Sequence, residues 1–433
     1  MRAHGIAGLV LAAVLSMTSV EVQAHGTGEP GRNYVKIMVS KREQRTKLAD
    51  LGVSIESVKS DSIYGTATDA ILARVRAAGF RVGETFVLGE GISPLDFPAD
   101  DARFHNYAEA TAAIDQIVAL KPDRMRKFSI GKTTEGRDIW AVQINSSMEF
   151  YDDGFTSGKP GIVFMGNHHA REHLSAEIPL MLMEYLAVNM DSDPEVSRLV
   201  SSRDIFIIPM VNPDGVEYDV STSRYKSHRK NMRQNARGGG FFDRGCLGVD
   251  LNRNYGFMWG TGGSSDDTCS DVYMGTAPFS EPETQAIKAF VEGRPNLKVL
   301  LSYHTFSELI LYPWGHKYEP IDNQNAKRAY ETMARTMAQW NGYTPQQSSE
   351  LYIASGDTTD WSWGQLGIFS FTFELSPKDM WSGGFYPGAG VIDNVFAANL
   401  RPALFLIDIA DDPYRVLQNE QDPLRDPRLS WLR

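Results

Sequence analysis

The segment Gly166–His173, with the sequence GNHHAREH, carries side chains that suit a metal ion. His169 and Glu172 lie three residues apart, directly after the apolar run Gly161–Met165. An imidazole nitrogen and a carboxylate oxygen are both good ligands for zinc. A catalytic zinc keeps three protein ligands and one open position for water. The pair therefore points to catalysis only if a third ligand and a general base lie elsewhere in the chain.

Two residues at the ends of other apolar runs are candidates for these roles. His304 follows the run Val299–Leu301, where a structural histidine is also common. Glu374 lies at the end of the apolar segment FSFTFEL, where burying a carboxylate costs free energy unless the group is paired or used. Burial raises the pKa of a glutamate towards neutral pH, which suits a general base. A glutamate paired with a lysine or an arginine is the structural alternative.

Basic and polar side chains gather in two further segments, HRKNMR and GVDLNRNY. Arg229 and Arg253 carry planar guanidinium groups, which bind a carboxylate through two parallel hydrogen bonds. Asn252 precedes Arg253, and Asp250 can accept a hydrogen bond from a ligand imidazole and so fix its tautomer. Surface arginines are common, so each of these residues alone is weak evidence for a substrate site.

The composition excludes some classes of function. The chain has 433 residues, a formal net charge of -11 and a pI of about 5.4. Hydrophobic residues make up 42% and charged residues 22%, which is typical of a packed globular core. The length suits two or three domains. Because nucleic-acid binding usually needs a basic face, we expect no nucleic-acid partner.

Residues 1–24 have the pattern of an export signal. Arg2 and His4 give it a polar start, the apolar run Gly5–Met17 follows, and Val22–Ala24 suits cleavage by signal peptidase. A membrane anchor is the alternative, but the run is short for a bilayer span. We therefore expect a secreted or periplasmic protein without a membrane span after signal removal.

The chain has two cysteines, Cys246 and Cys269. Export into an oxidising compartment makes one disulfide between them the default, and two separate free thiols are the alternative. The two cysteines lie 23 positions apart. Closing a loop of that length stabilises a protein by about 3 kcal/mol in the chain-entropy description.

After the signal, short strands and helices alternate. The hydrophobic pattern predicts strands at Tyr34–Val39, Ser54–Lys59, Ile63–Ala67 and Phe80–Leu88, and helices at Lys41–Leu51 and Thr68–Ala78. The order β-α-β-β-α-β is the split βαβ, or ferredoxin-like, pattern of a small α+β domain. Residues 91–102, with Gly, Pro and Asp, predict a linker.

From Phe104 onward, longer helices alternate with buried strands. The pattern predicts strands at Lys127–Ile130, Ile139–Ile144, Gly161–Met165, Ile205–Met210, Val299–Tyr303 and Ile368–Phe373, and helices at Tyr107–Leu120, His173–Met190, Glu281–Glu292, Ala326–Trp340 and Val391–Ile409. This alternation predicts an α/β fold, with a mixed, mostly parallel sheet and helices on both faces. Sites in such sheets gather at the carboxyl ends of the strands, which is where His169, His304 and Glu374 fall.

Together, the segments resemble the zinc carboxypeptidases of the carboxypeptidase A family. The resemblance covers roughly residues 104–409 and rests on GNHHARE, NPDG, SHRKN, GVDLNRNY, SYHTFS, LYPWG, LYIASGDTTDW and FTFEL, in the order of the family. A lone HxxE would mean little, whereas the ordered set is specific. The split βαβ unit before Phe104 resembles, by pattern rather than by motif, the activation domain of the procarboxypeptidases.

The resemblance implies a metal site with one Zn²⁺ held by His169, Glu172 and His304. It implies that Asp250 orients His169 from behind. It also implies that Glu374 is the general base and later the proton donor to the leaving amine. Cys246 and Cys269 fall where pancreatic members carry a disulfide.

The resemblance further implies a substrate site for peptide or protein C-termini. Arg229 stabilises the oxyanion, while Asn252 and Arg253 hold the terminal carboxylate of the substrate. Tyr352 closes over that carboxylate, and Arg171 adds a secondary contact. Such a clamp explains an exopeptidase, because an internal peptide bond offers no free carboxylate.

The sequence gives a weaker indication of which C-terminal side chain of the substrate the enzyme prefers. In this family, the residue just before the Asp-Trp of IASGDTTDW helps to set specificity, and here it is Thr359, which indicates no single preference. Asp357 lies two residues earlier and is placed to reach a cation. We therefore expect broad specificity, with apolar C-terminal residues favoured and basic ones accepted.

A competing interpretation of the motif exists. His169, Glu172 and His173 also fit H-x-x-E-H, the inverted zinc-peptidase motif, in which both histidines bind the metal and the glutamate is the base. That scheme needs the motif within one helix and leaves His304 and Glu374 without a role. Two other functions are alternatives to an exported metallocarboxypeptidase: a cell-wall peptide hydrolase with the same fold, and an inactive peptide-binding protein.

The sequence thus predicts five regions. They are a signal peptide at 1–24, an activation domain at 33–90, a linker at 91–102, a catalytic zinc carboxypeptidase domain at 103–412 and a loosely held tail at 413–433. If the N-terminal domain is inhibitory, an activating protease must cut in or near the linker. A fixed accessory domain is the alternative.

Overall fold

The computed structural model describes residues 32–87, 97, 101–146, 158–221, 225–235 and 246–419. The predicted signal at 1–24, most of the predicted linker and residues 420–433 lie outside the described residues. The described chain forms two separate β-sheets, of four and eight strands.

Residues 32–87 form a small α+β unit, called the N-terminal module below. Its elements in chain order are β1 (Arg32–Met38), α1 (Arg42–Asp50), β2 (Ser54–Val58), β3 (Ser62–Thr68), α2 (Asp69–Ala77) and β4 (Arg81–Val87). The sheet order is β2-β3-β1-β4, and each neighbouring pair is antiparallel. This is the ferredoxin-like arrangement that the sequence pattern predicts.

The larger sheet belongs to residues 101–419, which are called the catalytic unit below. Its strands are β5 (Met125–Lys132), β6 (Asp138–Ile144), β7 (Gly161–Gly166), β8 (Asp204–Ile208), β9 (Leu297–Thr305), β10 (Leu309–Tyr312), β11 (Thr344–Gln347) and β12 (Phe369–Leu375). Their order is β11-β10-β12-β9-β7-β8-β6-β5. The four central strands, β12, β9, β7 and β8, are mutually parallel, and antiparallel pairs lie towards both edges. The predicted mixed sheet is confirmed.

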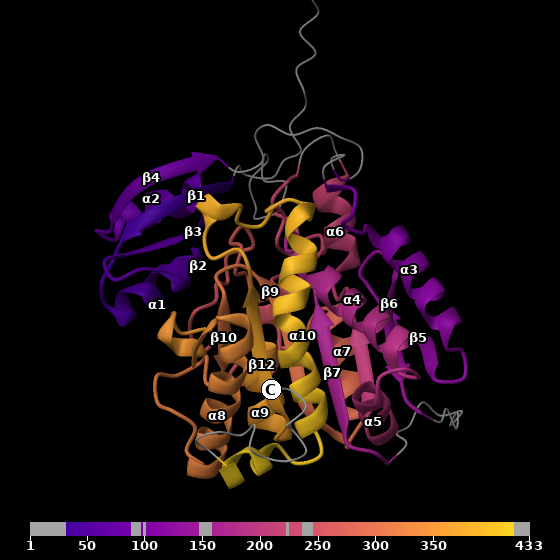
Figure 1. The fold of residues 1–433 in the computed structure, drawn as a ribbon. Helices are drawn as coiled ribbons and strands as arrows, with labels where there is room; N and C mark the ends of the chain where they lie inside the picture. Colours follow the sequence, from indigo (N-terminus) through magenta and orange to yellow (C-terminus); the bar gives the residue numbers. More distant parts are fainter. Residues whose placement is uncertain are drawn as a thin grey trace, which may run out of the picture.

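Helices cover both faces of this sheet (Figure 1). They are α3 (Tyr107–Leu120), α4 (Leu174–Asn189), α5 (Pro194–Ser202), α6 (Pro213–Val220), α7 (Pro282–Glu292), α8 (Gln324–Asn341), α9 (Thr358–Leu366) and α10 (Ile392–Ile409). One face packs on α3, α4, α8 and α10, and the other on α7 and α9. Successive residues of β7 point to opposite faces, so its unbroken apolar run fills both cores: Ile162 and Phe164 on one side, Val163 and Met165 on the other.

The sequence analysis predicts no membrane span after the signal, but the segment of helix α10 meets the simple criteria for one. By length and composition alone, Ala389–Ile409 is apolar enough to do so. Half of its apolar window is buried inside the structure, and α10 packs against α8 and α4 in the core. A core helix of a globular domain meets the same criteria, which explains why its composition is so apolar.

The start of the predicted tail is not loose. Pro413–Asn419 forms the 3-10 helix η6, which packs against α8. Val416 is buried in the main core, and Arg415 is buried and paired with Asp408 at 2.8 Å. Burial and ion pairing of this kind leave no trace in the local hydrophobic pattern, so a polar segment resembled a free end.

Candidate active site

Three neighbouring parallel strands bring the predicted metal-site residues together. In the pairing of β12 with β9, Glu374 lies directly opposite His304. Strand β7 pairs with the other side of β9 and ends at Gly166, three residues before His169. Because all three strands run in the same direction, their carboxyl ends share one edge of the sheet, where sites are expected in this fold class.

A tight turn between β7 and α4 presents His169 and Glu172 to the same point. Asn167 adopts a left-handed conformation, with φ of 56°, which asparagine tolerates better than most residues. Its Nδ2 donates to the carbonyl oxygen of His169 at 3.0 Å. Ser175 Oγ donates to the carbonyl oxygen of Glu172 at 2.6 Å. These bonds fix the backbone on both sides of the pair.

Three ligand atoms converge at this edge. His169 Nδ1 lies 2.8 Å from Glu172 Oε1 and 3.1 Å from His304 Nδ1. His304 Nδ1 lies 3.0 Å from Glu172 Oε2. All three side chains are buried. Among the described residues, this is the group of histidine and acidic side chains that is arranged to hold a metal ion.

The donor set fits zinc. With metal–ligand distances of about 2.0–2.1 Å, a tetrahedral ion separates neighbouring ligand atoms by about 3.3 Å, close to the spacing observed here. His169 Nε2 lies 3.0 Å from Asp250 Oδ1, so a proton on Nε2 leaves the lone pair of Nδ1 facing the cluster. Burial raises the pKa of Glu172, but His169 and His304 outweigh this effect and hold the pKa below its ordinary value. The carboxylate is therefore ionised and able to bind a cation.

Glu374 lies beside this cluster and lines the same cavity. Burial, then the neighbouring carboxylates of Glu172 and Glu56, raise the pKa of Glu374 well above its ordinary value. A carboxyl group with a raised pKa is a stronger base than an ordinary glutamate, and it can accept a proton and return it during a reaction.

Arg229 and Asp250 form the wall behind the cluster. Arg229 Nε donates to Asp250 Oδ2 at 3.1 Å, and its Nη1 lies 3.8 Å from Glu172 Oε1. Burial lowers the pKa of Arg229, but Asp250, Glu56 and Glu172 more than compensate and raise it above its ordinary value. Asp250 thus holds two groups in place at once: the permanently charged guanidinium of Arg229 and the imidazole of His169.

Asn252, Arg253 and Tyr352 line the cavity together. Arg253 Nε donates to the carbonyl oxygen of Gly263 at 3.1 Å, and Nη2 donates to Tyr352 Oη at 2.9 Å. Asn252 Oδ1 accepts from the backbone N–H of Thr358 at 2.9 Å. Because the amide oxygen is engaged there, the Nδ2 group is directed away from the backbone N–H of Thr358.

Asp357 and Thr359 also line the cavity, with the apolar side chains of Leu311, Leu351 and Ala354. Asp357 caps α9 by accepting a hydrogen bond from the backbone N–H of Asp360 at 2.7 Å. Burial, then the nearby carboxylate of Asp360, raise the pKa of Asp357 well above its ordinary value. The cavity lining therefore offers three apolar side chains and a further acidic group, in addition to Glu56, Glu172 and Glu374.

Arg171 is fully buried, is not among the residues that line the cavity, and is engaged by the N-terminal module. Its Nη2 donates to Glu56 Oε1 at 2.8 Å, and its Nη1 donates to Asp271 Oδ2 at 3.4 Å. Glu56 lies at a β-bulge of β2, an irregularity that re-aims a side chain, and together with Ile55 it lines the catalytic cavity. No local pattern indicates this contact, because it joins residues 115 positions apart.

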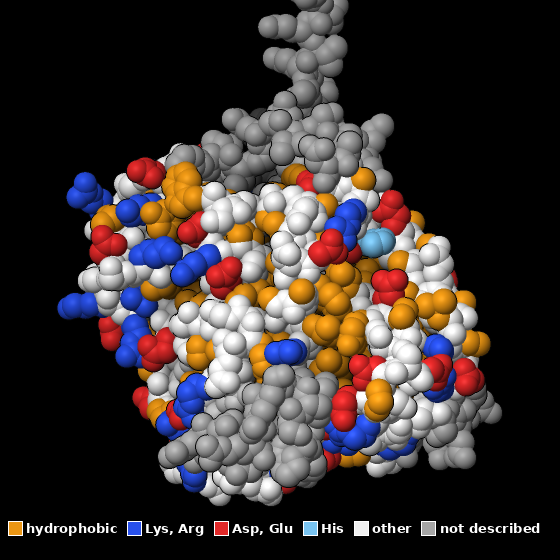
Figure 2. Space-filling model, in the orientation of Figure 1, with side chains coloured by type: hydrophobic (Ala, Val, Ile, Leu, Met, Phe, Trp, Pro, Cys, Tyr) orange, Lys and Arg blue, Asp and Glu red, His pale blue; other side chains and the backbone are white. Residues whose placement is uncertain are grey.

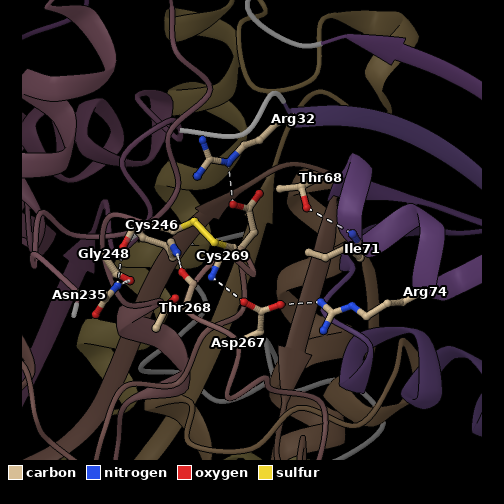
Figure 3. Close-up of a disulfide and its surroundings, with 12 residues drawn as sticks. Arg32, Thr68, Ile71, Arg74, Asn235, Cys246, Gly248, Asp267, Thr268 and Cys269 are labelled. Carbon is tan, nitrogen blue, oxygen red and sulfur yellow. Dashed lines mark hydrogen bonds and ion pairs between the residues drawn. A yellow bond between two sulfur atoms is a disulfide. The ribbon is translucent and has the colours of Figure 1, made fainter. Parts of the chain in front are cut away.

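The module also docks on the segment around the disulfide (Figure 3). The structure pairs Cys246 with Cys269, as predicted. Beside Cys269, Asp267 pairs with Arg74 of α2 at 2.7 Å, and Asp271 pairs with Arg32 of β1 at 2.7 Å. Acidic side chains of the disulfide-linked segment thus hold basic side chains of the module, and Figure 2 shows further charged side chains on the outer face of the module.

Aromatic packing adds to this interface. Tyr34 of β1 is buried against Phe306 and Phe385 of the catalytic unit. The guanidinium carbon of Arg171 lies 4.1 Å from the centre of the Phe385 ring. The module therefore covers an aromatic and cationic surface next to the metal-binding cluster.

His173 lies apart from the cluster, which bears on the inverted motif. Its Nε2 lies 2.9 Å from Asp219 Oδ2, among the rings of Phe97, Tyr225 and Tyr386. The motif also straddles a turn, since α4 begins only at Leu174. The geometry thus favours His304 over His173 as the third ligand.

The fold and the site together define a metal-dependent hydrolase of the α/β class, with a buried His-Glu-His set beside a glutamate and two arginines that line the same cavity. The family model for zinc carboxypeptidases matches residues 110–401. The chain belongs to the zinc carboxypeptidase family, and it is a metallocarboxypeptidase, a zinc-dependent exopeptidase.

Curated relatives carry the same description. The chain is 34% identical over 407 residues to a zinc carboxypeptidase of Saccharothrix mutabilis subsp. capreolus, and the match covers 89% of this chain and 90% of that protein. It is 31% identical over 277 residues to carboxypeptidase A5 of Macaca fascicularis, where the match covers 63% of this chain and 60% of that protein.

Solved structures agree on the fold. The crystal structure of carboxypeptidase A from Helicoverpa armigera superposes with a TM-score of 0.70 at 24% identity, over 88% of this chain and 98% of that one. The crystal structure of thrombin activatable fibrinolysis inhibitor gives a TM-score of 0.67 at 22% identity, over 88% and 99%.

Proposed function

We propose that the protein is an exported metallocarboxypeptidase that binds one zinc ion per chain and uses Glu374 as its general base. The convergence of His169, Glu172 and His304 beside Glu374 carries this proposal. Zinc, when bound, supplies a Lewis acid that lowers the pKa of water towards about 7.

The residues of the chain perform the proton transfers and bind the charge. Glu374 accepts a proton from the attacking water and later donates it to the leaving amine, a dual role that its raised pKa supports. Arg229 stabilises the negative charge that develops on the scissile carbonyl oxygen. Asn252 and Arg253 bind the terminal carboxylate of the substrate, and Tyr352 closes over it, so cleavage is confined to the last peptide bond.

Replacement of Glu374 tests the mechanism. Glu374→Gln retains the shape of the side chain but cannot accept a proton, so we expect kcat to fall by at least about a hundredfold with zinc content unchanged. Zinc content and release of C-terminal amino acids are measured on one sample, before and after a chelator. Activity that survives complete zinc removal, or a near-normal kcat in the variant, contradicts the proposal.

We further propose broad specificity for the C-terminal residue. The side chains of Leu311, Leu351 and Ala354 support apolar residues. The carboxyl group of Asp357 supports lysine and arginine, because a bound cation lowers its raised pKa and favours the ionised form. Asp357→Asn should reduce kcat/KM for C-terminal Lys and Arg peptides by about tenfold and leave C-terminal Phe and Leu peptides within about twofold. Cleavage confined to acidic C-terminal residues contradicts this proposal.

We also propose that the N-terminal module is an activation domain, inhibitory until a protease cuts between residues 89 and 102. Two contacts support this proposal: Glu56 accepts a hydrogen bond from Arg171, and Tyr352 packs with the core of the module. The matches to the two solved structures each cover 88% of this chain, which is more than the catalytic unit alone makes up. The predicted export signal at 1–24 supports our proposal that the protein acts in the periplasm or in the medium.

A further inference from the structure

His168 is a fully buried polar residue that the proposed mechanism does not use. It precedes the metal ligand His169 and stacks on the ring of His304, with ring centres 5.5 Å apart and planes 14° from parallel. Its Nδ1 lies 3.2 Å from Ser302 Oγ, and its Nε2 lies 2.9 Å from Tyr255 Oη and 3.3 Å from Thr358 Oγ1. The ring therefore joins strand β9, helix α9 and the loop before residue 256.

The direction of these hydrogen bonds follows from the groups present. The hydroxyl of Thr358 donates to Asn252 Oδ1 at 2.9 Å, which uses its only proton. Thr358 Oγ1 can then only accept from His168 Nε2. A histidine with its proton on Nε2 has a lone pair on Nδ1, which accepts from the hydroxyl of Ser302. The tautomer with the proton on Nε2 thus fits the contacts with Thr358 and Ser302, and Tyr255 Oη accepts from the same N–H.

The network ends at the group that recognises the substrate. Asn252 Oδ1 accepts from both the hydroxyl and the backbone N–H of Thr358, each at 2.9 Å. Two donors on the oxygen exclude the flipped amide, because a flip would point the Nδ2 group at those donors. The orientation that remains directs Nδ2 away from Thr358, and Asn252 lines the catalytic cavity.

We propose that His168 is a positioning residue for substrate binding. Through Thr358, it holds the Asn252 amide in the orientation that binds the terminal carboxylate, and its ring packs against the ring of His304. The inference rests on the proposed roles of Asn252 and His304. An apolar side chain fills the same space and avoids the free-energy cost of burying a polar ring, so the histidine is explained by what its nitrogens hold. Its effect falls on carboxylate recognition more than on the chemical step.

The test replaces His168 by Leu and by Gln in the full chain. Each variant is assayed after limited proteolysis between residues 89 and 102, with both fragments kept in the sample. His168→Leu should raise KM about tenfold, keep kcat within about twofold and retain zinc. His168→Gln, which offers an N–H near the position of Nε2, should recover most of the loss. A general structural defect would instead lower thermal stability and reduce kcat in both variants.

Binding of 3-phenylpropanoate, a carboxylate that needs no turnover, gives a second readout by calorimetry. We expect about tenfold weaker binding in His168→Leu and a nearly normal affinity in His168→Gln. Should His168→Leu fail to fold, Thr358→Val replaces it, since this variant keeps the backbone N–H to Asn252 and should weaken binding about threefold. Unchanged KM and unchanged affinity in the variants overturn the inference alone. A wild-type chain that releases no C-terminal residue and binds no 3-phenylpropanoate overturns the proposed function with it.

Discussion

At the scale of single residues, the site is defined by shared partners. Asp250 binds both the ligand His169 and Arg229, and Glu172 lies between two imidazoles. Each of these buried charges thus has an opposite or hydrogen-bonding neighbour, which is the condition for keeping it buried. Loss of one member therefore leaves its partner unsatisfied.

His105 offers a pH test of such a pair away from the site. His105 Nδ1 lies 2.8 Å from Glu177 Oε2, and this hydrogen bond raises the pKa of His105 above its ordinary value despite partial burial. A raised pKa in the folded state means that the pair stabilises fully below about pH 6.5 and less as the pH rises through the shifted value. His105→Gln should therefore destabilise the protein more at pH 5.5 than at pH 8.5.

The magnitude of this effect is small. The side chain of His105 is 35% exposed, so solvent screening limits the difference to less than about 1 kcal/mol. Thermal unfolding of both proteins at the two pH values measures it. An equal loss at both pH values, or a larger loss at pH 8.5, shows that charge on His105 does not contribute.

At the scale of elements, the turns after the strands are as decisive as the strands. Sequence patterning locates β7, β9 and β12 because long apolar runs have a strong local signal. It does not locate helix α6, since NPDG resembles a turn. In fact, Asn212 caps this helix through a hydrogen bond from the backbone N–H of Gly215 at 3.1 Å, and Pro213 occupies its first turn.

Asn212 also ties distant segments together. Its Nδ2 donates to the carbonyl oxygens of His168 at 3.2 Å and Lys230 at 3.0 Å. Asn212→Ala removes a helix cap and leaves two buried carbonyls without this donor, so we expect a loss of about 2–4 kcal/mol in the free energy of unfolding.

The matched control is Asn106→Ala, which removes the cap of α3 at a half-buried position. It should cost about 1 kcal/mol. Denaturant unfolding of the two variants gives the comparison. If both lose the same amount, the contacts of Asn212 with the two carbonyl groups contribute nothing.

At the scale of the whole molecule, several contacts hold the N-terminal module on the catalytic unit. Ion pairs from Arg32 and Arg74, aromatic packing of Tyr34 and the reach of Glu56 into the cavity all hold the two units together. They lie on three elements of the module, β1, β2 and α2, so the interface is broad and depends on no single contact.

Glu56 is the contact that reaches furthest into the site. Glu56→Gln removes its charge, weakens the hold on Arg171 and should raise the activity of the intact chain by up to about tenfold. Glu84→Gln, at an exposed position of β4 in the same module, is the control and should change nothing. Rates of C-terminal release are measured before and after cleavage between residues 89 and 102.

After cleavage, the two variants and the wild type should be equally active, because the module no longer covers the site. An uncleaved wild-type chain as active as the cleaved one refutes the inhibitory role. The N-terminal module is then a fixed accessory domain, the alternative that the sequence leaves open.

Local sequence features were enough to predict the class of fold and the side chains of the site. Apolar runs and capping residues are local features, and ordered motifs such as GNHHARE and GVDLNRNY name side chains without regard to distance. The candidate ligand set, the candidate base and the paired cysteines were accessible for this reason.

The complete fold was needed to establish which of these side chains meet. The opposition of His304 and Glu374 depends on strand register, the network from His168 to Asn252 crosses three elements, and Glu56 contacts Arg171 through the docking of a separate unit. Such contacts join residues far apart in the chain, and the free energy that selects them comes from packing and charge pairing of the complete fold, which no local pattern encodes.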